Sequence, residues 1–136
     1  MESVKGEASK FLLDTHVLLW WLFDDPKLSG PAHDVIQAPD NTILVSSASG
    51  WEIATKHRLG KLPHAGEAAR HLPSLLRKSR MTVLPINMEH ALAAGALPGP
   101  HRDPFDRMLI AQGQIEGLPI VTSDRVFHQY SVELVW

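Results

Sequence analysis

Acidic side chains stand at places in this sequence where short apolar runs end. Asp14 directly follows one such run, Glu52 lies shortly after a second, and Asp124 lies shortly after a third. Asp103 and Asp106 are three residues apart at the start of a segment with helical periodicity, so they occupy neighbouring positions on one helix face. Carboxylate oxygens are ligands that hard cations prefer, and the chain has no cysteine. The set therefore predicts a site for Mg²⁺ or Mn²⁺ rather than for zinc.

Such a carboxylate cluster has a clear chemical use. Two divalent ions about 3.5–4 Å apart activate water and stabilise the leaving oxygen when a phosphodiester bond is cleaved. The same ions attract a phosphate into a pocket that would otherwise repel it. We therefore treat four acids as candidate catalytic residues and metal ligands, and Asp103 as a further candidate ligand: Asp14, Glu52, Asp106 and Asp124.

Strand-like and helix-like segments alternate along the chain. Short β-prone runs are expected at residues 11–13, 41–45, 81–86, 119–121 and 132–135. Helices are expected at residues 17–23, 31–37, 49–59, 65–78, 88–97 and 104–116. Pro73 should kink or split the fourth of these helices, and Gly117 should end the last. The alternation predicts an α/β fold, a three-layer sandwich around a central four- or five-stranded, mostly parallel sheet.

This architecture explains why the positions of the acids matter. In an open parallel sheet, ligands bind in the crevice beyond the carboxyl ends of the strands. Asp14 and Asp124 follow strands directly, and Glu52 lies in the first turn of the helix after another strand. Acids from well-separated parts of the chain are therefore expected to gather at one edge of the sheet.

Each acid also has a purely structural interpretation. Glu52 stands three residues after Ser49, the spacing of a helix capping box. Asp103 precedes Pro104 and suits the N-cap of a helix that has proline at its first position. Asp14 could cap the apolar helix that follows it, and Asp124 could order a turn. The joint placement of the acids, more than any one of them, favours a catalytic site.

Composition limits the class of protein. The 136 residues fit one domain, which we expect to span residues 10–136 after a loosely ordered segment at residues 1–9. The net charge of −2 argues against a protein that grips nucleic acid over its whole surface. The basic residues Lys56, Arg58 and Lys61 could still contact an RNA backbone locally. No apolar run is long enough to span a membrane and no secretion leader opens the chain, so we expect a cytoplasmic protein without a membrane partner.

Several motifs together resemble the PIN domain, and more narrowly the VapC-type toxins of bacterial toxin–antitoxin pairs. They occur in the order and spacing of that family and cover the chain from Phe11 onward. The motifs are Leu12-Leu13-Asp14-Thr15-His16, Val45-Ser46-Ser47 with Trp51-Glu52-Ile53-Ala54, His101-Arg102-Asp103-Pro104-Phe105-Asp106-Arg107-Met108-Leu109-Ile110-Ala111-Gln112, and Val121-Thr122-Ser123-Asp124.

The resemblance carries specific expectations. It implies that Asp14, Glu52 and Asp106 are the three core acids of the site and that Asp124 is a fourth, more variable one. It leaves open whether Asp103 assists the metal or only caps a helix. It also places hydroxyl groups near the site, at Thr122 and at Ser47. The implied activity is that of a Mg²⁺- or Mn²⁺-dependent endoribonuclease acting on an RNA substrate, a homodimer inhibited by a cognate antitoxin protein.

The apolar run from Val17 to Phe23 gives a separate reason to expect a homodimer. It is wider than the single stripe that an amphipathic helix needs, and it contains Trp20 and Trp21. We expect the surface around these tryptophans to form the dimer contact, with contributions from the third strand and the alanine-rich helix.

Two alternative functions remain open at this point. A receiver-like signalling or interaction module also groups acids at strand ends and binds magnesium. Such a module normally has paired acids after its first strand and a phosphoacceptor aspartate after its third, whereas here Asp14 stands alone and Pro85-Ile86-Asn87 contains no acid. A nuclease that acts on DNA would carry the same acids.

Overall fold

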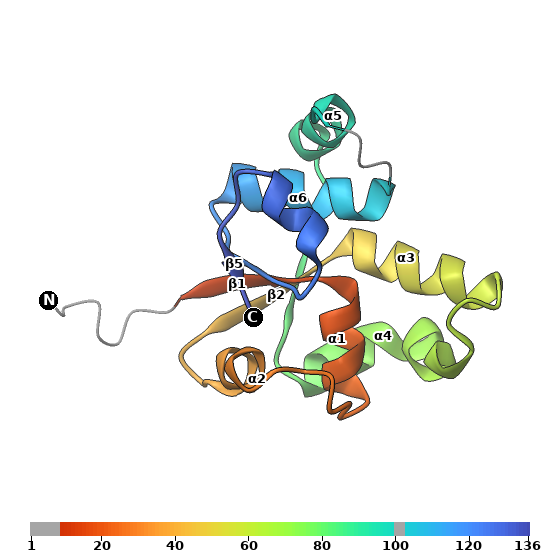
Figure 1. Cartoon of the computed structure of the whole chain (residues 1–136). Coiled ribbons are helices and arrows are strands. Elements are labelled where there is room, and N and C mark those ends of the chain that lie inside the picture. The colour runs from red at the N-terminus through yellow and green to blue at the C-terminus, as the bar shows by residue number, and fades with distance from the viewer. Residues whose placement is uncertain (1–8, 100–102) are drawn as a thin grey trace, which may run out of the picture.

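The computed structural model describes residues 9–99 and 103–136 of the chain. Apart from Ser9, the segment expected to be loosely ordered lies outside the described residues, and so do His101 and Arg102. In the described part, the chain forms a central sheet with helices on both of its faces (Figure 1). The predicted α/β sandwich is therefore confirmed.

The sheet has five strands, and every neighbouring pair is parallel. Their order is β3-β2-β1-β4-β5, which puts the first strand in the middle. The pairing brings Leu12 beside Leu44 on one side and beside Ile120 on the other. The strands are β1 Lys10–Leu13, β2 Thr42–Ser46, β3 Thr82–Leu84, β4 Ile120–Val121 and β5 Leu134–Val135.

The pleat of the strands sends successive side chains into two separate cores. Leu13 points into a core formed with side chains of the helices on one face, including Val17 and Ile53. Leu12 points into the opposite core, against Leu109 of the last helix. The helices are α1 Thr15–Leu22, α2 Gly30–Gln37, α3 Ser47–Arg58, α4 Gly66–Lys78, α5 Met88–Ala96 and α6 Pro104–Glu116, with short 3₁₀ helices at Pro63–Ala65 and Arg125–Gln129.

Most element boundaries follow from local rules. The predicted bounds of α6 are confirmed, and Gly117 ends it with a φ of 66°, a conformation that glycine adopts without strain. The predicted interruption of α4 is also confirmed, because His71, just before Pro73, has non-helical angles. The expected start of α3 at Ser49 is wrong, because the helix begins at Ser47 and Ser46 accepts the capping hydrogen bond from the Ala48 N–H.

α5 packs on α6 and away from the sheet (Figure 1). The contact includes His90, which is buried and whose Nε2 lies 2.8 Å from Glu116 Oε2. The guanidinium of Arg107 in α6 donates to the carbonyl oxygens of Ala94 and Leu97, at 3.0 and 2.6 Å, near the end of α5. α5 is therefore fastened to the turn of α6 that carries Asp106.

The apolar surface expected to form a dimer contact is exposed mainly at α5, the alanine-rich helix, and less at Trp20 and Trp21. Trp20 and Trp21 are only partly exposed, because they pack against the core beneath α1. The largest exposed apolar side chains in the α5 region are Met88 and Leu92, at 74% and 69%. None of the helices in the described segments is both long and apolar enough to cross a membrane.

Candidate active site

The strand order of the sheet reverses between β1 and β4, and the first two site residues meet at this point. The chain leaves β1 at Asp14 and β4 at Thr122. The Thr122 hydroxyl donates a hydrogen bond of 2.8 Å to Asp14 Oδ2, and the Asp124 backbone N–H donates to Thr122 Oγ1 at 3.0 Å. A crevice at such a reversal is the usual ligand position in open α/β sheets. A hydrogen bond thus joins the residues that follow β1 and β4, at the carboxyl edge of the sheet where the acids were expected.

Asp14 occupies the N-cap position of α1 but does not cap it. Its side chain makes no capping hydrogen bond, and only 5% of the residue is exposed. Burial raises the pKa of the Asp14 carboxyl, although the Thr122 hydrogen bond and the charge of His16 oppose this shift. The negative charges of Glu52 and Asp124 raise the pKa further. Glu52 and Asp124 are therefore each close enough to Asp14 to repel its negative charge.

Glu52 is equally buried, with 3% of the residue exposed. The capping-box interpretation of this residue is wrong, because Ser46 caps α3 and Ser49 instead hydrogen-bonds Thr15 at 2.8 Å. One carboxylate oxygen of Glu52, Oε2, accepts a hydrogen bond from the Lys56 ammonium one helical turn later. The other oxygen, Oε1, is buried and has no hydrogen-bond partner among the described residues. A buried carboxylate oxygen in that condition is unfavourable unless a hydrogen-bond donor or a cation binds to it.

Asp103 and Asp106 lie at the start of α6, and their charges act on Lys56, the partner of Glu52. Asp103 Oδ1 accepts hydrogen bonds from the backbone N–H groups of Phe105 and Asp106, so the predicted cap is confirmed. Partial burial lowers the pKa of the Lys56 ammonium. The hydrogen bond and charge of Glu52, together with the charges of Asp103 and Asp106, outweigh this effect and raise the pKa above its usual value. Lys56 thus stands between the acid of α3 and the acids of α6.

Asp124 has the ordering role that was its structural alternative. Its Oδ1 accepts from the Val126 N–H and starts the 3₁₀ helix at Arg125–Gln129. The residue is exposed, unlike Asp14 and Glu52, yet its charge acts on Asp14. Both roles are compatible, because a carboxylate has two oxygens with several acceptor positions.

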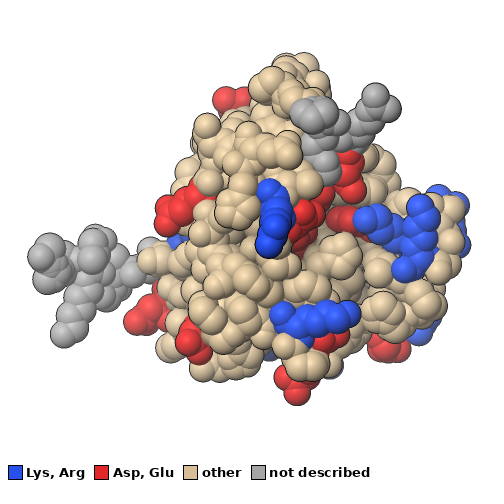
Figure 2. All heavy atoms as spheres, in the orientation of Figure 1, with Lys and Arg blue, Asp and Glu red and all other residues tan. Residues whose placement is uncertain are grey.

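The five acids form one electrostatic centre at the carboxyl edge of the sheet. The charges of Glu52 and Asp124 act on Asp14, while those of Glu52, Asp103 and Asp106 act on Lys56. Figure 2 shows acidic side chains in the middle of this face, between α3 and α6, with basic side chains on either side of them. Glu52 belongs to both sets of interactions and so links the acid after β1 to the acids of α6.

The donor atoms of this centre fit a hard divalent cation. They are carboxylate and hydroxyl oxygens, and the buried Glu52 Oε1 lacks a partner within the described residues. Over residues 9–99 and 103–136, no three acidic or histidine side chains already stand at metal-binding spacing. One oxygen of Glu52 accepts a hydrogen bond from Lys56, and one oxygen of Asp124 accepts a hydrogen bond from the Val126 N–H. The side chains would therefore have to shift to surround an ion.

Thr122 was expected near the site, but neither its hydrogen bond to Asp14 nor the ion pair between Lys56 and Glu52 was predicted. The link between Lys56 and Glu52 has a local signal, since the two residues are four apart on α3, an arrangement that favours an ion pair. The bond from Thr122 to Asp14 spans 108 residues and has no such signal. Ser47, the other hydroxyl expected near the site, is exposed at the start of α3.

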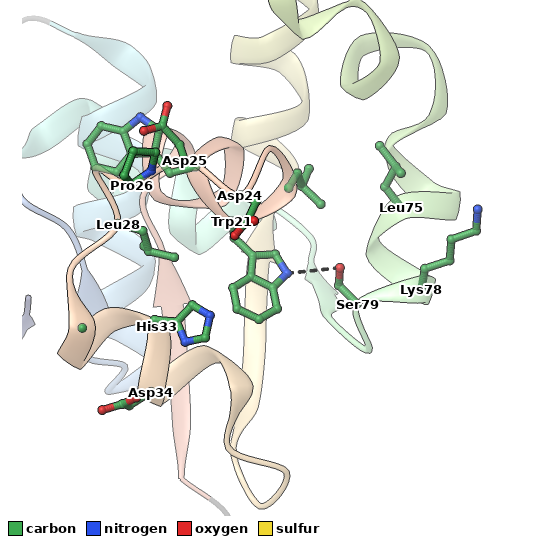
Figure 3. A pocket seen from close by; sticks show the side chains of 13 residues that line it. Trp21, Asp24, Asp25, Pro26, Leu28, His33, Asp34, Leu75, Lys78 and Ser79 are labelled. Atoms are coloured by element: carbon green, nitrogen blue, oxygen red, sulfur yellow. Dashed lines mark hydrogen bonds between the residues drawn. The ribbon is translucent and has the colours of Figure 1, made fainter.

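A second hollow lies at the opposite end of α1 from Asp14. It is a groove of about 720 Å³ between the α1–α2 segment and α4. Figure 3 shows Trp21 and His33 facing Leu75 and Ser79 across it, and the Trp21 Nε1–H donates to Ser79 Oγ at 3.3 Å. Three carboxylates also line the groove: Asp24, Asp25 and Asp34.

The fold and the acidic crevice define a class of doubly wound α/β proteins that gather carboxylates at a strand-order reversal. Comparison with known proteins names the family. The model of the PIN domain matches residues 11–133, and the chain belongs to that family.

Relatives and solved structures agree with this assignment. Ribonuclease VapC22 of Mycobacterium tuberculosis is 31% identical over 84% of this chain and 86% of its own length. Ribonuclease VapC16 of the same organism is 42% identical, but that match spans only 44% of this chain and 41% of the relative. The crystal structure of VapBC2 from Rickettsia felis, bound to a DNA fragment from its promoter, shares the fold. Its TM-score is 0.66 at 17% identity, and the match covers 92% of this chain and 96% of that one.

The raised pKa of Asp14 leads to a prediction about stability. A carboxyl with a raised folded-state pKa favours folding only when protonated, so its stabilisation is present below the unfolded value of 3.8 and is lost as the pH rises through the folded value. In chelated buffer at pH 7, Asp14→Asn should therefore raise the melting temperature, on the order of 3–6 °C, the shift that about 1 kcal/mol produces in a domain of this size.

The melting-temperature difference between Asp14→Asn and wild type should shrink as the pH is lowered toward 4. Asp40→Asn, a change of an exposed residue with the same loss of charge, serves as the control and should have little effect. A melting temperature of Asp14→Asn below that of wild type at pH 7 would show that the carboxylate stabilises the metal-free fold.

Proposed function

We propose that this protein is a metal-dependent endoribonuclease that uses Mg²⁺ or Mn²⁺ to hydrolyse RNA phosphodiester bonds. The observation that carries the proposal is the pair of buried carboxylates, Asp14 and Glu52, of which Glu52 has an oxygen without a hydrogen-bond partner among the described residues. A fold that keeps like charges together at a ligand crevice is best explained by a cation that binds there. The names of the two related ribonucleases support RNA as the substrate.

The metal would be held by carboxylates from four parts of the chain: Asp14, Glu52, Asp106 and Asp124. When bound, it supplies an activated water and stabilises the charge on the leaving oxygen. The Thr122 hydroxyl fixes the orientation of Asp14 through its hydrogen bond. Asp103 orders the first turn of α6 through two backbone hydrogen bonds, so we assign it a positioning role toward Asp106. Exposed basic residues of α3, such as Arg58, would contact the RNA backbone.

The receiver-like alternative is less well supported. A phosphoacceptor aspartate would be expected after β3, but β3 is followed by Pro85, Ile86 and Asn87. The match to the PIN family over residues 11–133 also favours a nuclease. DNA as the substrate is tested directly by including it in the cleavage assay.

The first prediction for the enzyme concerns the acids themselves. With Mn²⁺, Asp14→Asn or Asp106→Asn should lower the rate of RNA cleavage by more than about 100-fold, because even the outer partners of metal ligands contribute about 10–100-fold. Asp103→Asn should have a milder effect, since asparagine also caps helices. Cleavage of labelled structured RNA and single-stranded DNA, with and without chelator, measures both activity and substrate class.

Circular dichroism should show that these variants remain folded. Cleavage that persists in chelator would contradict the metal requirement. Equal inactivity of Asp103→Asn and Asp106→Asn would contradict the positioning role of Asp103.

A second part of the proposal is that the nuclease is the toxin of a toxin–antitoxin pair and acts in the cytoplasm. This part rests on the likeness to VapC ribonucleases and on a surface suited to a partner. An arginine from the partner would pair with two site carboxylates and hinder metal binding. The groove lined by Trp21, His33 and the acids of the α1–α2 segment offers an apolar and acidic surface for the rest of that protein.

Induced expression of the wild-type chain alone should arrest growth, and Asp14→Asn should relieve the arrest because the metal site is lost. Viable counts after induction provide the measurement. Co-expression of a cognate antitoxin protein should restore growth. Normal growth with soluble, metal-active wild-type protein would leave the nuclease assignment but remove the toxin assignment.

A third part is that the protein is a homodimer. The exposed side chains of Met88 and Leu92 lie one turn apart on α5, and β3, which precedes α5 in the chain, is an edge strand of the sheet. Apolar side chains of this size gathered on a surface are typical of an interface.

Analytical ultracentrifugation at about 10–100 µM, a range that detects weak association, should show a dimer for the wild type. Leu92→Asp should shift it to monomer because a charge cannot be buried in an apolar contact. Leu59→Asp changes another exposed leucine, at the end of α3, and should leave the dimer intact. A monomeric wild-type chain would contradict the proposal.

A further inference from the structure

The α3 helix places the cationic side chain of Lys56 among the acids of the site, because Lys56 and Glu52 are four residues apart on this helix. It follows Glu52 by one turn, and its ammonium donates to Glu52 Oε2. The two partners differ in their access to solvent, since the Lys56 side chain is 25% exposed and that of Glu52 is 3% exposed. The carboxylate therefore cannot leave the interior, whereas the lysine can reach water by a change of rotamer.

The surroundings hold this ammonium against α6. Its Nζ lies 5.9 Å from the centre of the Phe105 ring, a favourable distance for a cation–π contact. The ring of Trp51 packs edge-on against Phe105, with their centres 4.8 Å apart. The charges of Asp103 and Asp106 also attract the ammonium. The positive charge therefore sits where the acids of α3 and α6 meet.

A divalent ion at the unpartnered Glu52 Oε1 would share this carboxylate with the ammonium, which is bound at Oε2. A buried carboxylate without a counter-charge is strongly destabilising, so Glu52 requires a cation whether or not metal is present. An ammonium and a divalent ion on the two oxygens of one carboxylate repel each other at that short range. Binding of the ion therefore favours the departure of the lysine.

We propose that Lys56 is a resident competitor of the catalytic metal. Its ammonium compensates Glu52 in the metal-free protein, moves out to solvent when the divalent ion binds, and thereby sets the ion concentration at which the site becomes occupied. The inference rests on the metal-dependent function proposed above and adds a regulatory element to it. It also explains how the fold tolerates buried acids before metal arrives.

Mn²⁺ titration of purified variants by calorimetry tests this competition. Lys56→Met removes the charge but keeps a long apolar stem, and it should bind Mn²⁺ roughly two- to tenfold more tightly, the range expected when a partly exposed ion pair no longer competes. Lys56→Arg keeps the charge and should bind like the wild type. Lys27→Met removes a positive charge from an exposed loop residue and should leave the affinity unchanged.

Melting temperatures give a readout that does not depend on catalysis. In chelator, Lys56→Met should melt below the wild type, because Glu52 has lost its counter-charge. Saturating Mn²⁺ should raise the melting temperature of Lys56→Met more than that of the wild type. Equal or weaker Mn²⁺ binding by Lys56→Met would overturn the proposal and make Lys56 a supporting residue of the metal site.

A measurement on the wild-type chain keeps the test independent of how well the variants fold. Acylation of lysine amines, followed by mass spectrometry, should label Lys56 faster when Mn²⁺ is present, while Lys27 and Lys61 are labelled equally with and without the ion. Labelling of Lys56 that does not increase although calorimetry shows bound Mn²⁺ would overturn this inference alone. An absence of Mn²⁺ binding in every variant would overturn the metal-dependent function as well.

Discussion

Repulsion between buried carboxylates is the constraint on which the rest of this structure depends. Asp14 and Glu52 are 5% and 3% exposed, and the charge of Glu52 raises the pKa of Asp14. Two such groups come together only when the surrounding fold supplies enough free energy to hold them there. The β1–β4 ladder supplies part of it, because it ends at the hydrogen bond from Thr122 to Asp14. A cation that binds between the acids would remove the conflict.

The two cores of the sandwich determine how the site is assembled. Leu13 and Ile53 anchor β1 and α3 in one core, while Leu12 and Leu109 anchor β1 and α6 in the other. β1 is shared by both, so Asp14, directly after it, stands where the two halves meet. Arg107 then fastens the first turn of α6 to the end of α5. The two apolar cores stabilise the fold, whereas the acids at the carboxyl edge of the sheet repel one another. Such a cost in stability is typical of functional sites.

Much of the fold could be predicted because its rules are local. The pattern of apolar residues distinguishes the strands from the helices. Asp103 and Gly117 mark the two ends of α6, and Pro73 lies just after the break in α4. The start of α3 could not be predicted in the same way. Ser46 and Ser49 suit an N-cap equally well by residue type. Ser49 is instead used in a contact with Thr15, which lies 34 residues away and is brought near only by the packing of α1 against α3.

Some features of the candidate site could likewise be predicted from the sequence, and others depend on the tertiary structure. The sequence by itself determined which acids follow the strands, and therefore which edge of the sheet they share, because parallel strands place their carboxyl ends together. Only the tertiary structure decided what each acid contacts: a threonine 108 residues away for Asp14, and for Glu52 a lysine whose ammonium also faces the acids of α6. The physical reason is that spacing along a chain fixes the direction of a side chain on its own element, whereas the partner it meets depends on how separate elements pack.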